Sequence, residues 1–281
     1  MNNPTLRDVV TVLDQLYNPS RAEAWDAVGT VCGDPDQAVR RILFAVDPVR
    51  EVVAEAIDGR YDLLVTHHPL LLAAVHGVPA STPKGRVVHD LIRAGVALHV
   101  CHTNADVADP GVSDALATAL GLEDLRPLSP RAVAGAGHSD SGGLGRIGLL
   151  PAPLAARDFV AHVARSLPAT AAGVRAAGDL DRVVHRIAVC GGSGDSLLDD
   201  VRRAGVDAYV TADLRHHRVS EALEEGAPLL VDAAHWATEW PWLADAADRL
   251  RETLGERGTT VATTVSARVT DPWRLHVKET E

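Results

Sequence analysis

The chain has 281 residues, of which 46% are hydrophobic, and its formal net charge at pH 7 is −11. This length suits one large domain or two modest ones, each able to bury its own core without disulfide staples. The negative charge disfavours nucleic acid as a partner. The wide spacing of Cys32, Cys101 and Cys190 excludes a disulfide framework and a thiolate zinc knuckle.

The N-terminal stretch "MNNPTLRDVVTVLDQL" places Arg7, Asp8 and Asp14 inside an amphipathic pattern. It has no basic region leading into a long apolar one, and no run long enough to cross a bilayer. Together with the cysteine usage, this predicts a cytoplasmic protein that has no membrane partner.

Short apolar runs alternate with amphipathic helical patterns from residue 40 onward, which is typical of βα units. The elements expected in the first half are a strand at 40–47, a helix at 48–59, a strand at 61–68, a helix at 86–95, a strand at 96–102 and a helix at 114–120. The Gly-, Ser- and Pro-rich residues 126–146 are interpreted as a boundary or a mobile loop.

The second half repeats the alternation of strands and helices. The elements expected there are a helix at 153–167, a strand at 185–195, a helix at 196–204, a strand at 206–213, a helix at 216–226, a strand at 227–235 and a long helix to about Leu254. The final alternating stretch "TVATTVSARVTDPWRL" predicts an edge strand.

Histidines and carboxylates gather where the expected strands end. They are the adjacent pair His67 and His68, the pair His102 and Asp106, and the pair His235 and Glu239, the last two pairs at i, i+4 spacing. Each pair alone is better explained by structural histidines, but their joint occurrence at strand ends favours metal ligands. Imidazole and carboxylate together suit zinc, iron, manganese, cobalt or nickel, which this pattern does not distinguish.

The number of donors favours two ions. Four imidazoles and two carboxylates exceed the ligand set of one tetrahedral zinc ion, whereas two divalent ions that share a water would use all of them. Such a water loses its proton near neutral pH and becomes a nucleophile, so the pattern predicts hydrolytic chemistry.

One internal echo connects the two halves. "YDLLVT" leads to His67 and His68, and "VDAYVT" leads to His216 and His217; a helix and an apolar strand that ends in a histidine follow each. Chance similarity between two βαβ units is the alternative to a true duplication. His216 and His217, with Asp213, are candidates for residues that surround the metal ligands and orient them, or that contact the substrate. The alternative is that the two histidines simply begin a helix in solvent.

Several motifs together resemble the Nif-three-like dinuclear metal family, often labelled GTP cyclohydrolase 1 type 2. They are "AEAWDAVG", "VTHHPLLL", "HTNADVADPGVSDALATALGL", "AVCGGSGDSLLDDVRRAGVDAYVTADLRHH" and "VDAAHWATEW", in this order from about Glu23 to Trp240. Carried over position by position, the resemblance implies six metal ligands: His67, His68, His102, Asp106, His235 and Glu239. Ala212 and Ala234 stand where the family usually has glycine, so the loops there are expected to differ slightly.

The resemblance also implies an α/β fold of two α/β/α lobes with mixed sheets, whose pseudo-duplicated halves surround a dinuclear metal cleft. We assign residues 1–127 plus 228–281 to the metal-binding lobe and residues 128–227 to the second lobe. The interval between "GLGRIG" and "RIAVCGG" leaves no room for the inserted domain of some relatives. The implied assembly is a toroidal homohexamer.

The function that the resemblance implies is that of a metal-dependent hydrolase. It would use metal-bound hydroxide to attack C8 of a nucleotide-type substrate such as GTP, after which formate leaves. The alternatives are a two-metal phosphoesterase or nucleotidase, and a non-enzymatic metal-binding hexamer that acts as a scaffold or regulator. The "CGGSGD" loop (190–195) is either a tight strand-to-helix turn or a cradle for a substrate phosphate.

Overall fold

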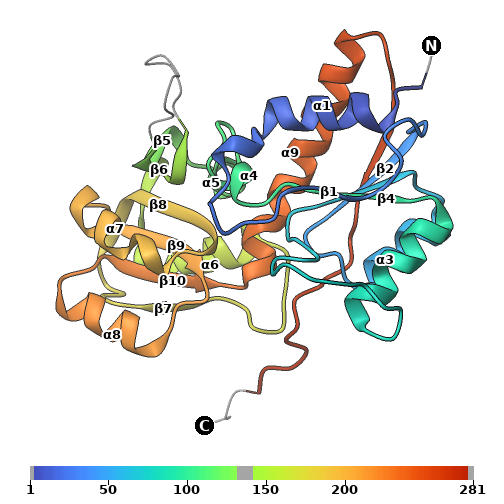
Figure 1. The fold of residues 1–281 in the computed structure, drawn as a ribbon. Coiled ribbons are helices and arrows are strands. Elements are labelled where there is room, and N and C mark those ends of the chain that lie inside the picture. The colour runs from blue at the N-terminus through green and yellow to red at the C-terminus, as the bar shows by residue number, and fades with distance from the viewer. Residues whose placement is uncertain (1–2, 132–141, 278–281) are drawn as a thin grey trace. The chain divides into compact units, whose positions relative to one another are not determined.

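The computed structural model describes residues 3–131 and 142–277. The chain divides into two compact units, each made from two stretches of sequence (Figure 1). Unit 1 comprises residues 1–108 and 243–270, and unit 2 comprises residues 109–242 and 271–281. This division differs from the predicted one, because the segments 109–127, 228–242 and 271–281 lie in unit 2.

Unit 1 is built around a five-stranded mixed sheet in the order β1-β4-β3-β2-β11. The strands are β1 (Gly29–Cys32), β2 (Arg41–Ala45), β3 (Leu63–Thr66), β4 (Ala97–Val100) and β11 (Ala262–Val265). β4, β3, β2 and β11 run parallel to their neighbours, and only β1 pairs in the antiparallel direction among the strands described. The edge strand predicted from "TVATTVSARVTDPWRL" is confirmed for Ala262–Val265, which form β11, and the residues from Ser266 to Leu275 are not in a strand.

Helices lie on both faces of this sheet. One face packs against α2 (Arg50–Asp58) and α3 (Pro83–Ala94), which place Val52, Val88 and Leu91 against β2, β3 and β4. α1 (Leu6–Leu16) and the C-terminal part of α9 (His235–Glu256) lie on the other side from α3 in Figure 1. The short helices η1 (Pro19–Arg21) and α4 (Thr103–Asp106) follow α1 and β4.

Local sequence explains where these helices begin and end. Thr5 and Asp8 form a capping box at the start of α1. Pro83 occupies the first turn of α3 behind the Thr82 cap, and Gly95 ends this helix with a left-handed φ of 70°.

Unit 2 contains a six-stranded mixed sheet in the order β5-β6-β8-β9-β10-β7. The strands are β5 (Glu123–Pro130), β6 (Gly143–Ala155), β7 (Arg175–Ala177), β8 (Val183–Ser193), β9 (Ala208–Ala212) and β10 (Leu229–Ala233). β8, β9 and β10 are parallel, and the outer pairs are antiparallel. The prediction of two α/β lobes with mixed sheets is confirmed.

The helices of unit 2 also cover both faces of its sheet. η2 (Asp195–Leu197), α7 (Leu198–Ala204) and α8 (His216–Glu224) enclose a core with Ile147, Ala188 and Tyr209. α5 (Val112–Ala119) and α6 (Ala156–Ser166) pack against β6 and β8, and they continue the α/β/α layering. Among the described helices of both units, none is long and apolar enough to cross a membrane.

The loop or boundary predicted at 126–146 is partly wrong. Residues 126–130 belong to β5, which pairs with the first part of β6 in an antiparallel hairpin. Pro127 and Pro130 argue against a strand in the sequence, because proline has no backbone N–H to donate. β5 is an edge strand, however, where proline is tolerated. Residues 132–141 lie outside the described part of the chain.

Candidate metal centre

In unit 1 the polar groups follow directly from the ends of parallel strands. β2, β3 and β4 are adjacent, and their registers align Ala45 with Thr66 and Thr66 with Val100. Residues just beyond these positions therefore meet at one edge of the sheet. Asp47 follows β2, His67 and His68 follow β3, and His102 follows β4.

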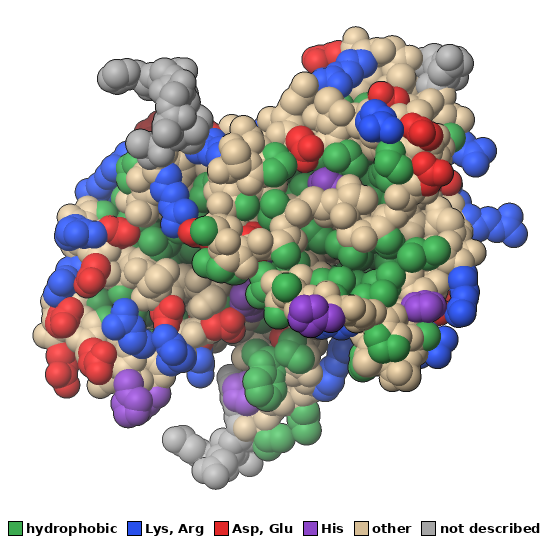
Figure 2. All heavy atoms as spheres, in the orientation of Figure 1, with side chains coloured by type: hydrophobic (Ala, Val, Ile, Leu, Met, Phe, Trp, Pro, Cys, Tyr) green, Lys and Arg blue, Asp and Glu red, His purple; other side chains and the backbone are tan. Residues whose placement is uncertain are grey.

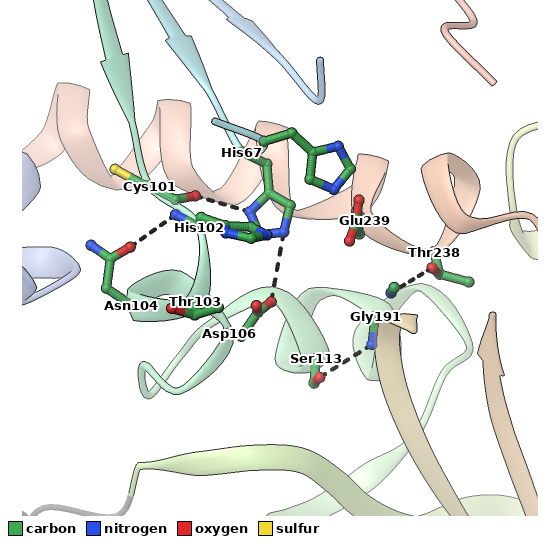
Figure 3. A network of polar contacts seen from close by, with 12 residues as sticks. His67, Cys101, His102, Thr103, Asn104, Asp106, Ser113, Gly191, Thr238 and Glu239 are labelled. Carbon is green, nitrogen blue, oxygen red and sulfur yellow. Dashed lines mark hydrogen bonds and ion pairs between the residues drawn. The ribbon is translucent and has the colours of Figure 1, made fainter. Parts of the chain in front are cut away.

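The three imidazoles of unit 1 form a compact cluster. The ring centroids lie 5.1 Å apart for His67 and His68, 5.2 Å for His67 and His102, and 5.6 Å for His68 and His102. Each ring offers one nitrogen that lies within 4.8 Å of the others. α4 places Asp106 in the same cluster, with its Oδ1 3.7 Å from His67 Nε2 (Figure 3). The structure thus brings together all four donors that were predicted in this unit.

Oxygen acceptors orient the three rings. Nδ1 of His67 lies 2.9 Å from the carbonyl oxygen of Cys101, Nδ1 of His68 lies 2.7 Å from Asp47 Oδ1, and Nδ1 of His102 lies 2.8 Å from Asp26 Oδ1. A carbonyl or carboxylate oxygen only accepts, so each Nδ1 carries the hydrogen and the lone pair is on Nε2. Histidines that bind metal ions are commonly held in this way, with one ring nitrogen bonded to an oxygen acceptor and the other nitrogen directed at the ion. The donor set therefore fits a divalent ion.

The surroundings of His102 favour its neutral form. Burial, followed by the neighbouring His67, lowers the pKa of His102. Burial raises the pKa of Asp26, but hydrogen bonds from His102 and Thr103 outweigh it, and the net shift is downward. Thr103 donates to Asp26 through both its backbone nitrogen and its hydroxyl. A neutral ring beside an ionised acceptor is the state that a metal ligand requires.

In unit 2 an aspartate also orients a histidine, and the two residues follow adjacent parallel strands. Asp213 follows β9 and His235 follows β10, and His235 Nδ1 lies 2.7 Å from Asp213 Oδ2. Asp213, rather than Ala212, takes the left-handed conformation in this turn, with φ 56°. Both copies of the sequence echo lie in parallel βαβ units, β3-α3-β4 and β9-α8-β10, as a true duplication and a chance similarity both predict.

His235 and Glu239 form the donor pair of unit 2. They lie on the first turn of α9, with His235 Nε2 2.9 Å from Glu239 Oε1, and Glu239 is 3% exposed. The His235 ring is bracketed by two carboxylates. Nε2 lies close to an anionic oxygen, so a cation shared by the two atoms, either a proton or a metal ion, stabilises this arrangement. The pair therefore also fits a divalent ion.

The "CGGSGD" loop supports this donor pair through a set of hydroxyl contacts. Gly191 N donates to Ser113 Oγ at 3.4 Å and Gly192 N to Thr238 Oγ1 at 2.9 Å (Figure 3). Thr211 Oγ1 in turn donates to the carbonyl oxygen of Gly192. These two amides are bonded within unit 2, so they do not form the phosphate cradle considered from the sequence. The tight-turn interpretation describes this part of the loop.

Gly192 leaves room for the donor atoms. Its φ is +67°, and a Cβ at this position would collide with Glu239 Oε1 and lie 3.1 Å from His235 Nε2. We expect Gly192→Ala to displace the Glu239 carboxylate and to weaken divalent-ion binding roughly 10- to 100-fold, the usual cost of disturbing the support of a metal ligand. Calorimetric titration with Zn²⁺ or Mn²⁺ measures this effect.

Gly205→Ala is the matched control, because Gly205 has a similar φ of +60° and open space around its Cβ position. Both variants carry the left-handed strain of alanine, roughly 1 kcal/mol, but only Gly192→Ala is expected to lose metal affinity. Equal affinities in the two variants would show that Gly192 does not position the pair.

Among the described residues, His216 and His217 form none of the polar contacts around His235. They are the exposed first residues of α8, and their ring centroids lie 5.2 Å apart. Arginines near them pair with acids, as Arg215 does with Asp195, and Figure 2 shows basic and acidic side chains intermixed over α7 and α8. Of the three outer candidates, only Asp213 orients a predicted ligand.

Comparison with known proteins identifies the family. Residues 4–272 match the model of Duf34/NIF3 (NGG1p interacting factor 3). The chain is 57% identical to a Streptomyces coelicolor protein named GTP cyclohydrolase 1 type 2 homolog, over 98% of this chain and 95% of that protein. The chain belongs to the Duf34/NIF3 family. The resemblance stated from the sequence motifs is confirmed.

Other Duf34/NIF3 relatives extend the comparison. A Mycobacterium tuberculosis protein with the same name is 40% identical, and its alignment runs over 371 residues, covering 96% of this chain and 97% of that protein. Because this chain has 281 residues, the mycobacterial protein carries additional residues that this chain lacks. This agrees with the expectation that the chain has no room for the inserted domain of some relatives.

Solved structures share the fold. A Bacillus cereus protein related to NIF3 superimposes with a TM-score of 0.91 at 24% identity, over 98% of this chain and all of that chain. A Staphylococcus aureus protein, SA1388, gives a TM-score of 0.88 at 27% identity, over 97% of this chain and 99% of that chain. That the donors of both units line one dinuclear cleft stays a prediction.

Proposed function

We propose that this Duf34/NIF3 chain is a metal-dependent hydrolase of the GTP cyclohydrolase 1 type 2 kind. The observation that carries the proposal is the cluster of three imidazoles in unit 1, each with Nδ1 held by an oxygen acceptor. The name shared by the curated relatives supports a nucleotide-type small molecule as the substrate.

Two divalent ions, bound by the six predicted ligands, would supply Lewis acidity and an activated water for hydrolysis. The ligands proposed are His67, His68, His102, Asp106, His235 and Glu239. Zinc, iron, manganese, cobalt and nickel all accept such donors. Asp26, Asp47 and Asp213 fix the ring orientations and increase the basicity of the coordinating nitrogens.

The buried carboxylate of Glu239 and the partly buried carboxylate of Asp106 bring negative charge to the donor sets. This charge offsets that of bound dications and makes their binding favourable in partly dehydrated surroundings. The reaction expected on GTP uses two waters: the first opens the five-membered purine ring at C8 to give a formamide, and the second hydrolyses this formamide, which releases C8 as formate and leaves an amine.

Assays of two products test the proposal on the purified, metal-loaded protein. We expect formate to be released from GTP, the release to stop on addition of EDTA, and a divalent metal to restore it. Phosphate release from GTP without formate would favour the phosphoesterase or nucleotidase alternative. A fall in thermal stability on chelation, with neither product formed, would contradict an enzymatic role and favour a metal-binding scaffold.

The homohexameric assembly stays a prediction from the family resemblance. Light scattering on the purified protein tests it, because a hexamer has six times the chain mass of 29.7 kDa.

A further inference from the structure

Trp25 is a large aromatic side chain that unit 1 leaves in solvent beside a proposed metal ligand. Its exposed fraction is 59%. Its ring centroid lies 6.0 Å from that of His102, with an interplanar angle of 76°, so the two rings meet edge to face. An indole with open surface next to the donor cluster is available to a molecule bound there.

The backbone on both sides of Trp25 is anchored. Glu23 N donates to Thr103 Oγ1 at 2.9 Å, and Asp26 N donates to Glu23 O at 2.9 Å. The Asp26 carboxylate accepts from Thr103 and contacts the His102 ring. The same contacts that orient His102 therefore hold the Trp25 loop, so the indole is presented at a fixed place relative to this ligand.

We propose that Trp25 is the stacking platform for the planar heteroaromatic ring of the substrate. The inference rests on the proposed function and adds a substrate-recognising residue to it. A pre-positioned indole loses little conformational entropy on binding, and every purine has a π-face that stacks on it. Through its edge contact with His102, the platform would place that ring next to the ligands of unit 1.

The experiment compares a probe with a base and one without. Titration calorimetry on the metal-loaded protein measures the Kd of GTP and of inorganic tripolyphosphate. We expect wild-type protein to bind GTP more tightly than tripolyphosphate. Trp25→Leu is expected to weaken GTP binding roughly 5- to 100-fold, the usual range for loss of one stacked base, and to leave tripolyphosphate binding unchanged.

Two further variants make the test specific. Trp25→Phe keeps an aromatic face and is expected to retain most of the GTP affinity. Trp273→Leu is the matched control, because Trp273 is a comparably exposed tryptophan, at 68%, in the C-terminal segment of unit 2. It is expected to bind both probes as the wild type does. Quenching of tryptophan fluorescence by GTP is expected to diminish in Trp25→Leu and to persist in Trp273→Leu.

Four results would overturn the inference. They are equal binding of GTP and tripolyphosphate by the wild type, unchanged GTP binding by Trp25→Leu, equal weakening of both probes, and a change in oligomeric mass in place of a change in GTP affinity. The last result would mean that a second copy of the chain covers Trp25.

Failure of the proposed reaction is distinguishable from failure of this inference. If base-dependent binding requires Trp25 but no formate appears, the platform stands and the reaction fails. If formate appears and Trp25→Leu leaves the KM for GTP unchanged, the reaction stands and the platform fails.

Discussion

Replacing Asp106 or Glu239 with alanine is expected to remove at least one divalent ion from the protein without unfolding it. Each substitution deletes a carboxylate donor, Asp106 near His67 Nε2 and Glu239 near His235 Nε2. The loss in affinity should exceed the roughly 10- to 100-fold cost of losing an outer partner of a ligand. Elemental analysis gives the metal content per chain, and circular dichroism shows that the fold persists.

The control for this prediction is a histidine in unit 1 that has a structural contact. His89 on α3 lies with its Nε2 3.1 Å from the carbonyl oxygen of Val78, and we expect His89→Ala to keep the wild-type metal content. Full metal occupancy in both Asp106→Ala and Glu239→Ala would contradict the ligand assignment.

Replacing Arg146 with methionine is expected to cause the largest loss of stability in unit 2. Arg146 is 1% exposed, and its Nε donates to Asp114 Oδ1 at 2.7 Å, while its Nη1 donates to the carbonyl oxygens of Gly143 and Gly145. The substitution strands a buried carboxylate and should lower the free energy of unfolding by about 3–5 kcal/mol. Urea denaturation in the presence of EDTA measures this change separately from metal binding.

Two further variants show whether the loss of stability comes from the unpaired buried charge. Arg146→Met combined with Asp114→Asn leaves no unpaired charge and keeps an oxygen that can cap Gly111 N, so it should recover part of the loss. Arg157 forms an exposed pair with Asp181 at 3.5 Å, and Arg157→Met should cost at most about 1 kcal/mol. If Arg146→Met were no more destabilising than Arg157→Met, the buried pair would not support unit 2 as described.

The histidines of the candidate site could be singled out from the sequence because each follows a short apolar strand. His67, His102 and His235 come one or two residues after β3, β4 and β10. Parallel neighbours put such positions at the same sheet edge, which is why a linear pattern indicated a spatial cluster within unit 1. The family resemblance implies the same six residues as ligands, and this assignment stays a prediction.

The partners that orient the rings are not marked by their spacing from the histidines, and Asp26 does not follow the end of a strand either. Asp26 lies 76 residues before His102, and Asp47 lies 21 residues before His68. Neither stands at a recognisable spacing, and only the folded loop and the β2–β3 register bring them to the rings. Asp47 could have been found by the rule that located the ligands, because it also follows the end of a parallel strand.

A histidine ring oriented by an aspartate from the adjacent strand occurs in both units. The histidine after one strand, His68 or His235, is oriented by an aspartate that follows the adjacent strand, Asp47 or Asp213. This detail pairs β2–β3 with β9–β10, whereas the sequence echo pairs β3–β4 with β9–β10, so the two repetitions are not in the same register. Each unit nevertheless carries an imidazole that an aspartate orients in the same way.

The most direct measurement is an anomalous-scattering crystal structure of protein purified without added metal. The account predicts two anomalous peaks per chain, with the side chains of His67, His68, His102, Asp106, His235 and Glu239 within coordination distance of them. Absence of peaks at these side chains, or peaks bound by other residues, would contradict it.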